Sequence, residues 1–494
     1  MKADRLASAR RIEEPIRTDD DLGSLWDAIT YEKGQTVLAM FEAWLGPERF
    51  QAGVRRYIQR HAWGTATGDD FFRALAEQDP ALPAAVRSFT RQAGIPLLDV
   101  TLRCDDGPPR LDLRQSRLLP LGSPTGTATP RWQLPLLVRT PAGTSRLLMT
   151  EAEARLPLPD AQCPAWGQAN ASGAGYHRTA YAGLGLQDLV NAPGLGIGDW
   201  LVLLDDVQGL HEAGVSGNPQ ALALVRAGAG HASPEVRRRA AELLAWLKPL
   251  VSDEGRTAYA ALWQDAFGAR ARDLGWTAQP GESHDLQLLR AVLLPQVATL
   301  GQDAALRDDA QRRATAWLSD RSTLDAELRR AVLSTAAETS PDAAAPALFE
   351  ALLTALRDSS QRPERQALLS ALGHFRQPAL AQRARELLLA PWLDIRESLA
   401  PLLAAQAAEP GTRAGALDFL ARQHAAVVQR MSREGAGGLP RFFKTACSAD
   451  AARRIEAVFS PQAARFAGGQ RALQTTLDAA RLCSAWRAQQ GDGL

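Results

Sequence analysis

The spacing of apolar residues changes twice along this chain of 494 residues, and no other feature restricts its fold as much. Apolar side chains recur every three to four residues up to about residue 94 and again from about residue 182, which indicates helices. Between these parts they alternate with polar side chains, which indicates strands buried on one face. We therefore expect a mainly α-helical chain with a small β domain in its middle, divided as 1–95, 96–165 and 166–494.

The first part predicts three short helices separated by tight turns. Val37, Phe41 and Leu45 lie on one face of the first helix. The third helix begins after Thr67, whose side chain can form a capping box with Asp70 three residues later. We expect these helices to pack on one another or beneath a cleft.

The middle part predicts strands. Leu98–Arg103 and Leu111–Gln115 alternate strictly between apolar and polar residues, Trp132–Val138 does so again, and Arg146–Met149 is a shorter candidate. Several short strands at close spacing, separated by Gly and Pro turns, are typical of a sandwich. We therefore expect a small antiparallel β-sandwich over 96–165.

The last part is helical by its pattern. Leu289, Leu293 and Val297, for example, line one face of a helix. Helices of this length with short polar turns predict antiparallel pairs that stack into a large α-solenoid, a helical-repeat superhelix, over 166–494. No fixed repeat motif recurs, so we do not expect a regular array.

Charge and hydropathy exclude two classes of partner. Lys plus Arg number 56 against 55 acidic residues, and no basic stripe indicates a nucleic-acid partner. No apolar run approaches the length of a membrane span, and the first residues lack the apolar region of a secretory signal. We expect a soluble protein; its compartment, its oligomeric state and whether Met1 is its natural start stay open.

The histidines offer no zinc site. They are His61, His177, His211, His231, His284, His374 and His424. No two are four residues apart, so no helix presents the paired ligands of a zinc peptidase on one face. His211-Glu212 comes closest, but Val215 stands where the second histidine is needed. We interpret His211 as a solvated histidine at a helix end.

The four cysteines, Cys104, Cys163, Cys447 and Cys483, contain no Cys-x-x-Cys pair and admit three disulfide pairings. Cys447 and Cys483 could meet if their helices pack together. Four cysteines in a chain of this length do not make a disulfide framework, however, and we expect free, buried thiols.

Several segments resemble one known family. Asp27–Gly34, the string Asp-Ala-Ile-Thr-Tyr-Glu-Lys-Gly, resembles the tyrosine segment of the gluzincin zinc aminopeptidases, the aminopeptidase N family. His61–Thr67 is similar to a phrase of the same catalytic domain, and Arg131–Leu136 and Gly175–Tyr181 resemble its β-sandwich. Leu274–Thr277 resembles the C-terminal helical domain of the endoplasmic-reticulum and puromycin-sensitive aminopeptidases.

The resemblance implies that 1–95 is a helical remnant of a thermolysin-like catalytic domain. It also implies that Tyr31 stabilises the oxyanion formed when a zinc-bound water attacks a peptide carbonyl. The family's His-Glu-x-x-His helix, its third zinc ligand and its Gly-x-Met-x-Asn loop lie upstream of this tyrosine, and none is among the thirty residues before Tyr31. We therefore expect no metal site and no activity in this chain alone; zinc, peptide substrates and an N-terminal peptidase half belong to the complete family architecture.

Other polar residues carry weaker functional interpretations. Four arginines could grip the carboxylate of a peptide, as arginines of the helical domain do in some relatives: Arg131, Arg178, Arg290 and Arg441. No position matches those relatives residue by residue, so we interpret each as a surface arginine. Glu32 and Lys33 are interpreted as solvated or structural, and Trp132 and Trp166 as core aromatics.

Two functions follow from these observations. The chain is either the C-terminal portion of a zinc metalloaminopeptidase, a hydrolase that removes N-terminal residues from peptides, or a non-catalytic α-solenoid module. The second would bind a peptide or a partner chain on its concave face. Metal content distinguishes the two.

Overall fold

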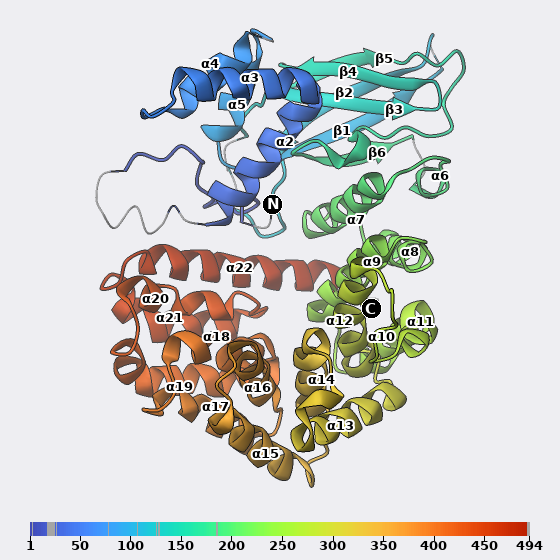
Figure 1. Ribbon diagram of the computed structural model, residues 1–494. Coiled ribbons are helices and arrows are strands. Elements are labelled where there is room, and N and C mark those ends of the chain that lie inside the picture. The colour runs from blue at the N-terminus through green and yellow to red at the C-terminus, as the bar shows by residue number, and fades with distance from the viewer. Residues whose placement is uncertain are drawn as a thin grey trace. The chain divides into compact units, whose positions relative to one another are not determined.

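The computed structural model (Figure 1) divides into two compact units, Met1–Leu224 and Val225–Leu494, and each is described here by itself. The residues described are 1, 3–16, 25, 27–77, 79–105, 107–124, 126, 129–183 and 186–491. As predicted, the chain is mainly helical, with small sheets and a helical C-terminal part. Among the helices described, none is both long and apolar enough to cross a membrane.

The three predicted helices and a further one that was not predicted occupy the start of the first unit. They are α2 (Gly34–Leu45), α3 (Pro47–Arg60), α4 (Gly68–Ala76) and α5 (Leu82–Thr90), and the short π-helix η1 (Ile29–Lys33) precedes them. The capping box of α4 is confirmed: Thr67 Oγ1 accepts from Asp70 N at 3.3 Å, and Thr67 N donates to Asp70 Oδ2 at 2.8 Å. Gly46 ends α2 with a φ of +87°, a conformation that favours glycine.

The predicted strands are present and form two sheets in the described part of this unit. One sheet has the order β5-β2-β1-β6, and the other is a hairpin of β3 and β4. Their bounds are β1 (Pro96–Arg103), β2 (Arg110–Arg117), β3 (Leu134–Thr140), β4 (Gly143–Met149), β5 (Glu153–Pro157) and β6 (Arg178–Ala182). Val100 pairs with Leu113 on the antiparallel side of β1 and with Tyr181 on the other side.

Strand β6 corrects the predicted antiparallel sandwich. It runs parallel to β1, so the larger sheet is mixed, and it lies beyond residue 165, where the strands were expected to end. A parallel neighbour requires a long crossover connection, which residues 158–177 provide. Local alternation of apolar residues shows a strand but not the direction in which it pairs, which is why the sequence did not reveal this.

One hydrophobic core runs from α2 and α5 into the sheets. The rings of Phe41 and Phe89 meet edge to face at 6.1 Å, and Phe89 meets Tyr176 in the same way at 6.3 Å. Trp132 belongs to this core and Trp166 is also buried, which confirms both as core aromatics. The helices before residue 95 and the sheets after it therefore pack as one body.

Three helices complete the first unit. The short 3-10 turn η2 (Ala171–Gly173) and α6 (Leu186–Val190) lead to α7 (Ile197–Glu212), which packs against β6. The next helix, α8 (Asn218–Ala229), crosses from the first unit into the second.

The second unit is built from helices in its described residues. Its elements are α9 (Pro234–Trp246), η3 (Lys248–Leu250), α10 (Arg256–Trp263), η4 (Gln264–Gly268), α11 (Ala269–Leu274), α12 (His284–Thr299), α13 (Ala304–Ser319), η5 (Arg321–Thr323), α14 (Ala326–Glu338), α15 (Ala345–Asp358), α16 (Arg362–His374), α17 (Pro378–Glu386), η6 (Leu387–Leu389), α18 (Ile395–Ala408), α19 (Pro410–Val428), α20 (Arg433–Gly437), η7 (Leu439–Phe443), α21 (Ala449–Ala463) and α22 (Gly469–Gln490). Helices α9, α12, α14, α16 and α18 pack against one another in this order. The last helix, α22, contacts η3, and the rings of Trp246 and Trp486 lie 4.4 Å apart.

Arginine side chains close the C-terminal ends of helices in this unit. Arg307 donates to the carbonyl of Ala298 at 2.6 Å and to that of Thr299 at 3.3 Å, at the end of α12. Arg413 donates to the carbonyl of Ala407 at 2.7 Å, at the end of α18. The last carbonyls of a helix have no partner within it and carry its negative dipole end, so a cation there is favourable.

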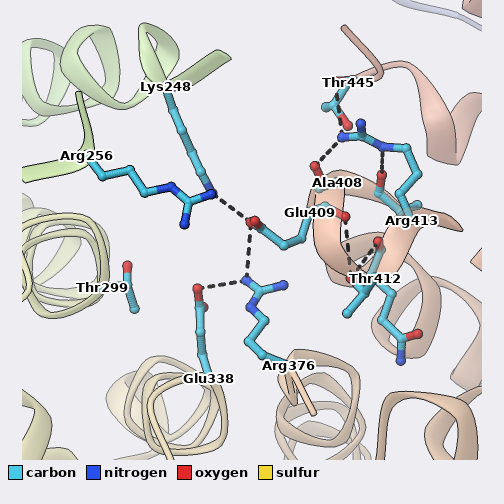
Figure 2. A network of polar contacts seen from close by, with 12 residues as sticks. Lys248, Arg256, Thr299, Glu338, Arg376, Ala408, Glu409, Thr412, Arg413 and Thr445 are labelled. Carbon is cyan, nitrogen blue, oxygen red and sulfur yellow. Dashed lines mark hydrogen bonds and ion pairs between the residues drawn. The ribbon is translucent and has the colours of Figure 1, made fainter. Parts of the chain in front are cut away.

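A polar network joins the start of the second unit to its later helices (Figure 2). Lys248 Nζ lies 2.6 Å from Glu409 Oε2, and Arg376 Nη2 lies 2.7 Å from Glu338 Oε1 and 3.8 Å from Glu409 Oε2. Burial opposes the charge of Glu409, but Lys248 and Arg376 together hold the pKa of this carboxyl below its ordinary value. Glu409 therefore stays ionised and links η3 to the segment between α18 and α19.

The cysteines correct the expectation of free thiols. Cys104 and Cys163 form one disulfide and Cys447 and Cys483 form another, so no cysteine of the chain is free. The partners are 59 and 36 residues apart in the sequence, and only long-range packing brings them together. The pairing of Cys447 with Cys483 depends on the contacts of α22 with η7 and α21.

Candidate functional site

Tyr31 lies in the π-helix η1, directly before α2. Its amide donates to the carbonyl of Asp27 at 3.1 Å, and its carbonyl accepts from the amide of Gly34. The side chain is 56% exposed. Single π-helical turns are frequent at functional sites, because the wider turn redirects one side chain without breaking the helix.

The backbone before Tyr31 is held by Arg10 and Asp27. The Asp27 carboxylate accepts from the amides of Ile29 at 2.9 Å and Thr30 at 3.2 Å, so it satisfies two of the free donors at the helix start. Arg10 is buried, pairs with the Asp27 carboxylate, and donates to Thr30 Oγ1 at 2.6 Å and to the carbonyl of Leu25 at 3.0 Å. Arg10 is not among the residues predicted from the sequence.

The backbone after Tyr31 is held by Lys33. Its ammonium lies 2.9 Å from Asp4 Oδ2 and donates to the carbonyl of Gln92 at 2.8 Å. Both charged side chains are only 1% exposed. Burial lowers the pKa of Lys33, and Asp4 opposes that shift. The interpretation of Lys33 as structural agrees with this arrangement, whereas Glu32 is exposed.

Apolar side chains on the segments that follow Tyr31 in the sequence are also exposed. Leu38 lies two turns further along α2 and is 38% exposed. Ile58 near the end of α3 is 59% exposed, and Trp63 after this helix is fully exposed with a φ of +61°, which is unusual for a bulky residue. We define Tyr31 and Leu38, which belong to the consecutive segments η1 and α2, as the uncovered surface.

The described residues provide no metal site, in that they contain no group of three His, Cys, Asp or Glu side chains able to hold an ion. They do not fit a zinc ion. The expectation that His211 is solvated is wrong, because this histidine is buried and its Nε2 lies 2.9 Å from Asn218 Oδ1. Burial lowers its pKa. The run of apolar residues before His211, Trp200–Leu204 with Val207 and Leu210, could have indicated this, since a helix rich in apolar residues is often buried.

Two of the four candidate arginines are not surface residues. Arg290 is 1% exposed, pairs with the Glu282 carboxylate and donates to the carbonyl of Gly275 at 2.8 Å. Arg178 is buried and pairs with Asp205 at 3.1 Å. Their guanidinium groups are thus engaged within the chain. The other two arginines, Arg131 and Arg441, are exposed as predicted.

A second buried polar cluster lies where β6 packs on α7. Arg178 Nη1 lies 3.5 Å from Asp206 Oδ1, and burial raises the pKa of Asp206 to about 8 although Arg178 opposes this. His177 is also buried, and burial lowers its pKa to about 4. This buried cluster was not predicted from the sequence. Its signal was the pair Asp205-Asp206 within the apolar run of α7.

His177 also borders a small cavity. Met40, Trp44 and Asn170 line it as well, and its volume is about 10 Å³. A space of this size holds about one water molecule. The cavity is too small for a peptide, so it is not a substrate pocket.

Comparison with known proteins agrees with the resemblance. The model of the ERAP1-like C-terminal domain matches residues 166–482, and that of the peptidase family M1 domain matches residues 1–92. Aminopeptidase M1-A of Oryza sativa subsp. japonica is 26% identical over 415 residues, which cover 81% of this chain and 46% of the relative.

Two further relatives are similarly distant. Aminopeptidase 2, mitochondrial, of Saccharomyces cerevisiae is 26% identical over 78% of this chain and 40% of its own length. Glutamyl aminopeptidase of Bitis rhinoceros is 25% identical over 78% of this chain and 40% of its own length. The chain thus spans less than half the length of these curated relatives. It belongs to the M1 aminopeptidase family, and it corresponds to the C-terminal portion of such an enzyme.

Proposed function

We propose that this chain is the C-terminal portion of a zinc metalloaminopeptidase that removes N-terminal residues from peptides, and that it supplies Tyr31 to the active site. The observation that carries the proposal is an exposed tyrosine side chain on a backbone held on both sides. Membership of the M1 family supports peptides as the substrates, and the names of the relatives agree.

In this role, the Tyr31 hydroxyl donates a hydrogen bond to the carbonyl oxygen of the peptide bond under attack. Negative charge develops on that oxygen, so a donor fixed in advance stabilises the transition state more than the substrate. One such donor contributes about 3 kcal/mol to catalysis. The fixed backbone matters because a donor that must first be ordered loses part of this gain.

The chain alone is proposed to be inactive. An oxyanion donor stabilises charge but does not activate a water molecule. The sequence has no two histidines four residues apart, and the described residues do not fit a metal ion. We therefore assign the zinc ion and the activation of water to an N-terminal peptidase half.

The uncovered surface supports such a partner. Tyr31 in η1 and Leu38 in α2 lie seven residues apart in the sequence, and both are exposed. Exposed apolar side chains that gather in one region often mark a protein interaction site. A peptidase half that covers the uncovered surface would bury them and bring its own residues close to Tyr31.

We further propose that the helical part is an α-solenoid and that the chain has the three parts 1–95, 96–165 and 166–494. The successive packing of α9, α12, α14, α16 and α18 supports the solenoid. It also favours the alternative function, a non-catalytic module, because solenoids bind peptides and partner chains along such helix rows.

Zinc analysis and a peptidase assay of this chain test the proposal. We expect less than stoichiometric zinc and no release of a chromogenic amine from aminoacyl substrates, with or without added zinc. A complete M1 aminopeptidase measured in parallel is the positive control. Stoichiometric zinc together with chelator-sensitive hydrolysis would contradict the assignment of the metal site to another half. Tight peptide binding without hydrolysis, even after an N-terminal half is added, would favour the alternative.

A further inference from the structure

The buried carboxylate of Asp4 joins segments that are distant in the sequence. Asp4 Oδ2 accepts from Tyr176 Oη at 3.0 Å and pairs with Lys33 Nζ at 2.9 Å, while Asp4 Oδ1 accepts from the amide of Gly94 at 2.8 Å. Lys33 Nζ also donates to the carbonyl of Gln92. We call these five residues the Asp4 junction. It connects the N-terminal segment, the π-helix, the end of α5 and the segment before β6.

Apolar side chains could fill the space that the charged groups of this junction occupy. Removing two charges from water costs several kcal/mol each, and well-packed apolar side chains often replace a buried ion pair without loss of stability. What the Asp4–Lys33 pair adds is direction. Lys33 Nζ is fixed to Asp4 and to the carbonyl of Gln92, and the Asp4 carboxylate is fixed in turn to Tyr176 and Gly94. Lys33 is thereby fixed more tightly than apolar packing alone would fix it.

Tyr31 lies between this junction and a second fixed point. Lys33 follows it by two residues in the same π-turn, and Thr30, which precedes it, is held by Arg10. The peptide units on both sides of Tyr31 are thus tied to buried groups, while its side chain is exposed. The direction in which the Tyr31 side chain leaves the backbone therefore depends on the groups that hold these peptide units.

We propose that Lys33 and Asp4 are positioning residues for Tyr31. They touch no reacting atom; they fix the backbone from which the hydroxyl projects. That the hydroxyl meets a substrate rests on the proposed function, whereas the fixing of the backbone does not.

The first test is amide relaxation of tyrosine in the full chain. The chain has five tyrosines, so [15N]tyrosine gives five amide signals, and Tyr31→Phe assigns the relevant one. We expect an order parameter of about 0.85 for Tyr31, falling below about 0.6 in Lys33→Met. Tyr57 in α3 should stay unchanged, which separates loss of positioning from general unfolding.

Two variants keep this test decisive. Asp4→Asn retains the shape of the side chain but removes its charge, and it decides the question if Lys33→Met does not fold. Arg290→Met removes a buried ion pair of the second unit, so it should leave the Tyr31 signal unchanged. An unchanged Tyr31 order parameter in a folded Lys33 or Asp4 variant overturns the proposal, and so does an equal change at Tyr57.

Activity provides a separate test when an N-terminal half restores it. Lys33→Met should lower kcat by up to about 100-fold, with little change in KM, because a displacement of about 1 Å is enough for such a loss. An unchanged kcat would contradict the positioning role. If no activity is restored at all, the proposed function is in doubt, and the relaxation test still decides the positioning role.

Discussion

Asp206 is the residue whose surroundings change its chemistry most clearly. Its carboxyl is buried between β6 and α7, and burial raises its pKa to about 8. In the unfolded chain this pKa is close to 4. The folded chain therefore holds a proton that the unfolded chain has released between these pH values. Its contribution to stability is complete below about pH 4 and is lost as the pH rises toward 8.

We predict that Asp206→Asn removes this pH dependence. Asparagine resembles the protonated carboxyl, so the variant and the wild type should be similarly stable near pH 4. Above that pH, the variant should become more stable by about 1.4 kcal/mol for each unit of pKa shift, with a plateau above about pH 8. Thermal unfolding across this range measures the difference. Asp253→Asn, at an exposed carboxylate of the second unit, is the control and should not show this difference; parallel pH profiles for Asp206→Asn and wild type would refute the prediction.

The residues around Tyr31 show which features could be predicted from the sequence and which could not. The local string around Tyr31 identified the tyrosine, and its exposure is visible in the structure. The partners that hold it are not local: Asp4 is 29 residues from Lys33, and Arg10 is 17 residues from Asp27. Arg290 was predicted to lie at the surface, and nothing in the sequence around it indicates that its side chain is buried.

Among the elements, helix α22 depends most on a covalent link. Cys483 of this helix is bonded to Cys447, which lies between η7 and α21, and Trp486 one turn later contacts Trp246. The link closes a segment of 36 residues, which stabilises the folded state by about 4 kcal/mol in the chain-entropy account. The disulfide fixes α22 to the segment before α21, and its contacts with η3 and Trp246 hold it at the start of its unit.

We predict that reduction lowers the melting temperature of the chain. The double variant Cys447→Ser, Cys483→Ser should show part of this loss without a reductant, and a reductant should then lower its melting temperature further only through the remaining disulfide, Cys104–Cys163. Circular dichroism at 222 nm during heating measures both. Thiol titration of the denatured, non-reduced wild type should find no free thiol. Four reactive thiols in that titration would show that the disulfides do not form.

The elements could be predicted where one face of each is apolar. The helices α2, α3 and α4 and the strands β1 to β4 lie where periodicity indicated helices and strands, because one apolar face decides the local structure. The direction of β6 and the two disulfides could not be predicted, because both depend on contacts between distant segments.

At the scale of the whole molecule, the chain contains two compact units and less than half the length of its relatives. Its order of segments, helices, then sheets, then helices, could be read from the sequence because each change of period covers many residues. The family was indicated by segments that resemble it, such as Asp27–Gly34 and Leu274–Thr277. The activity could not be predicted, since this chain carries the proposed oxyanion donor but its described residues carry no metal site.

The most direct measurement is a complementation assay with Tyr31 and its phenylalanine variant. The N-terminal half of a related M1 aminopeptidase is co-expressed with this chain, and hydrolysis of an aminoacyl substrate is measured. We predict activity only when both halves are present, and a loss of kcat of about 100-fold or more in Tyr31→Phe, which removes only the hydroxyl. Tyr57→Phe, at a tyrosine outside the proposed site, should retain full activity. A complemented enzyme with the same kcat for Tyr31 and Tyr31→Phe would contradict the role of this tyrosine.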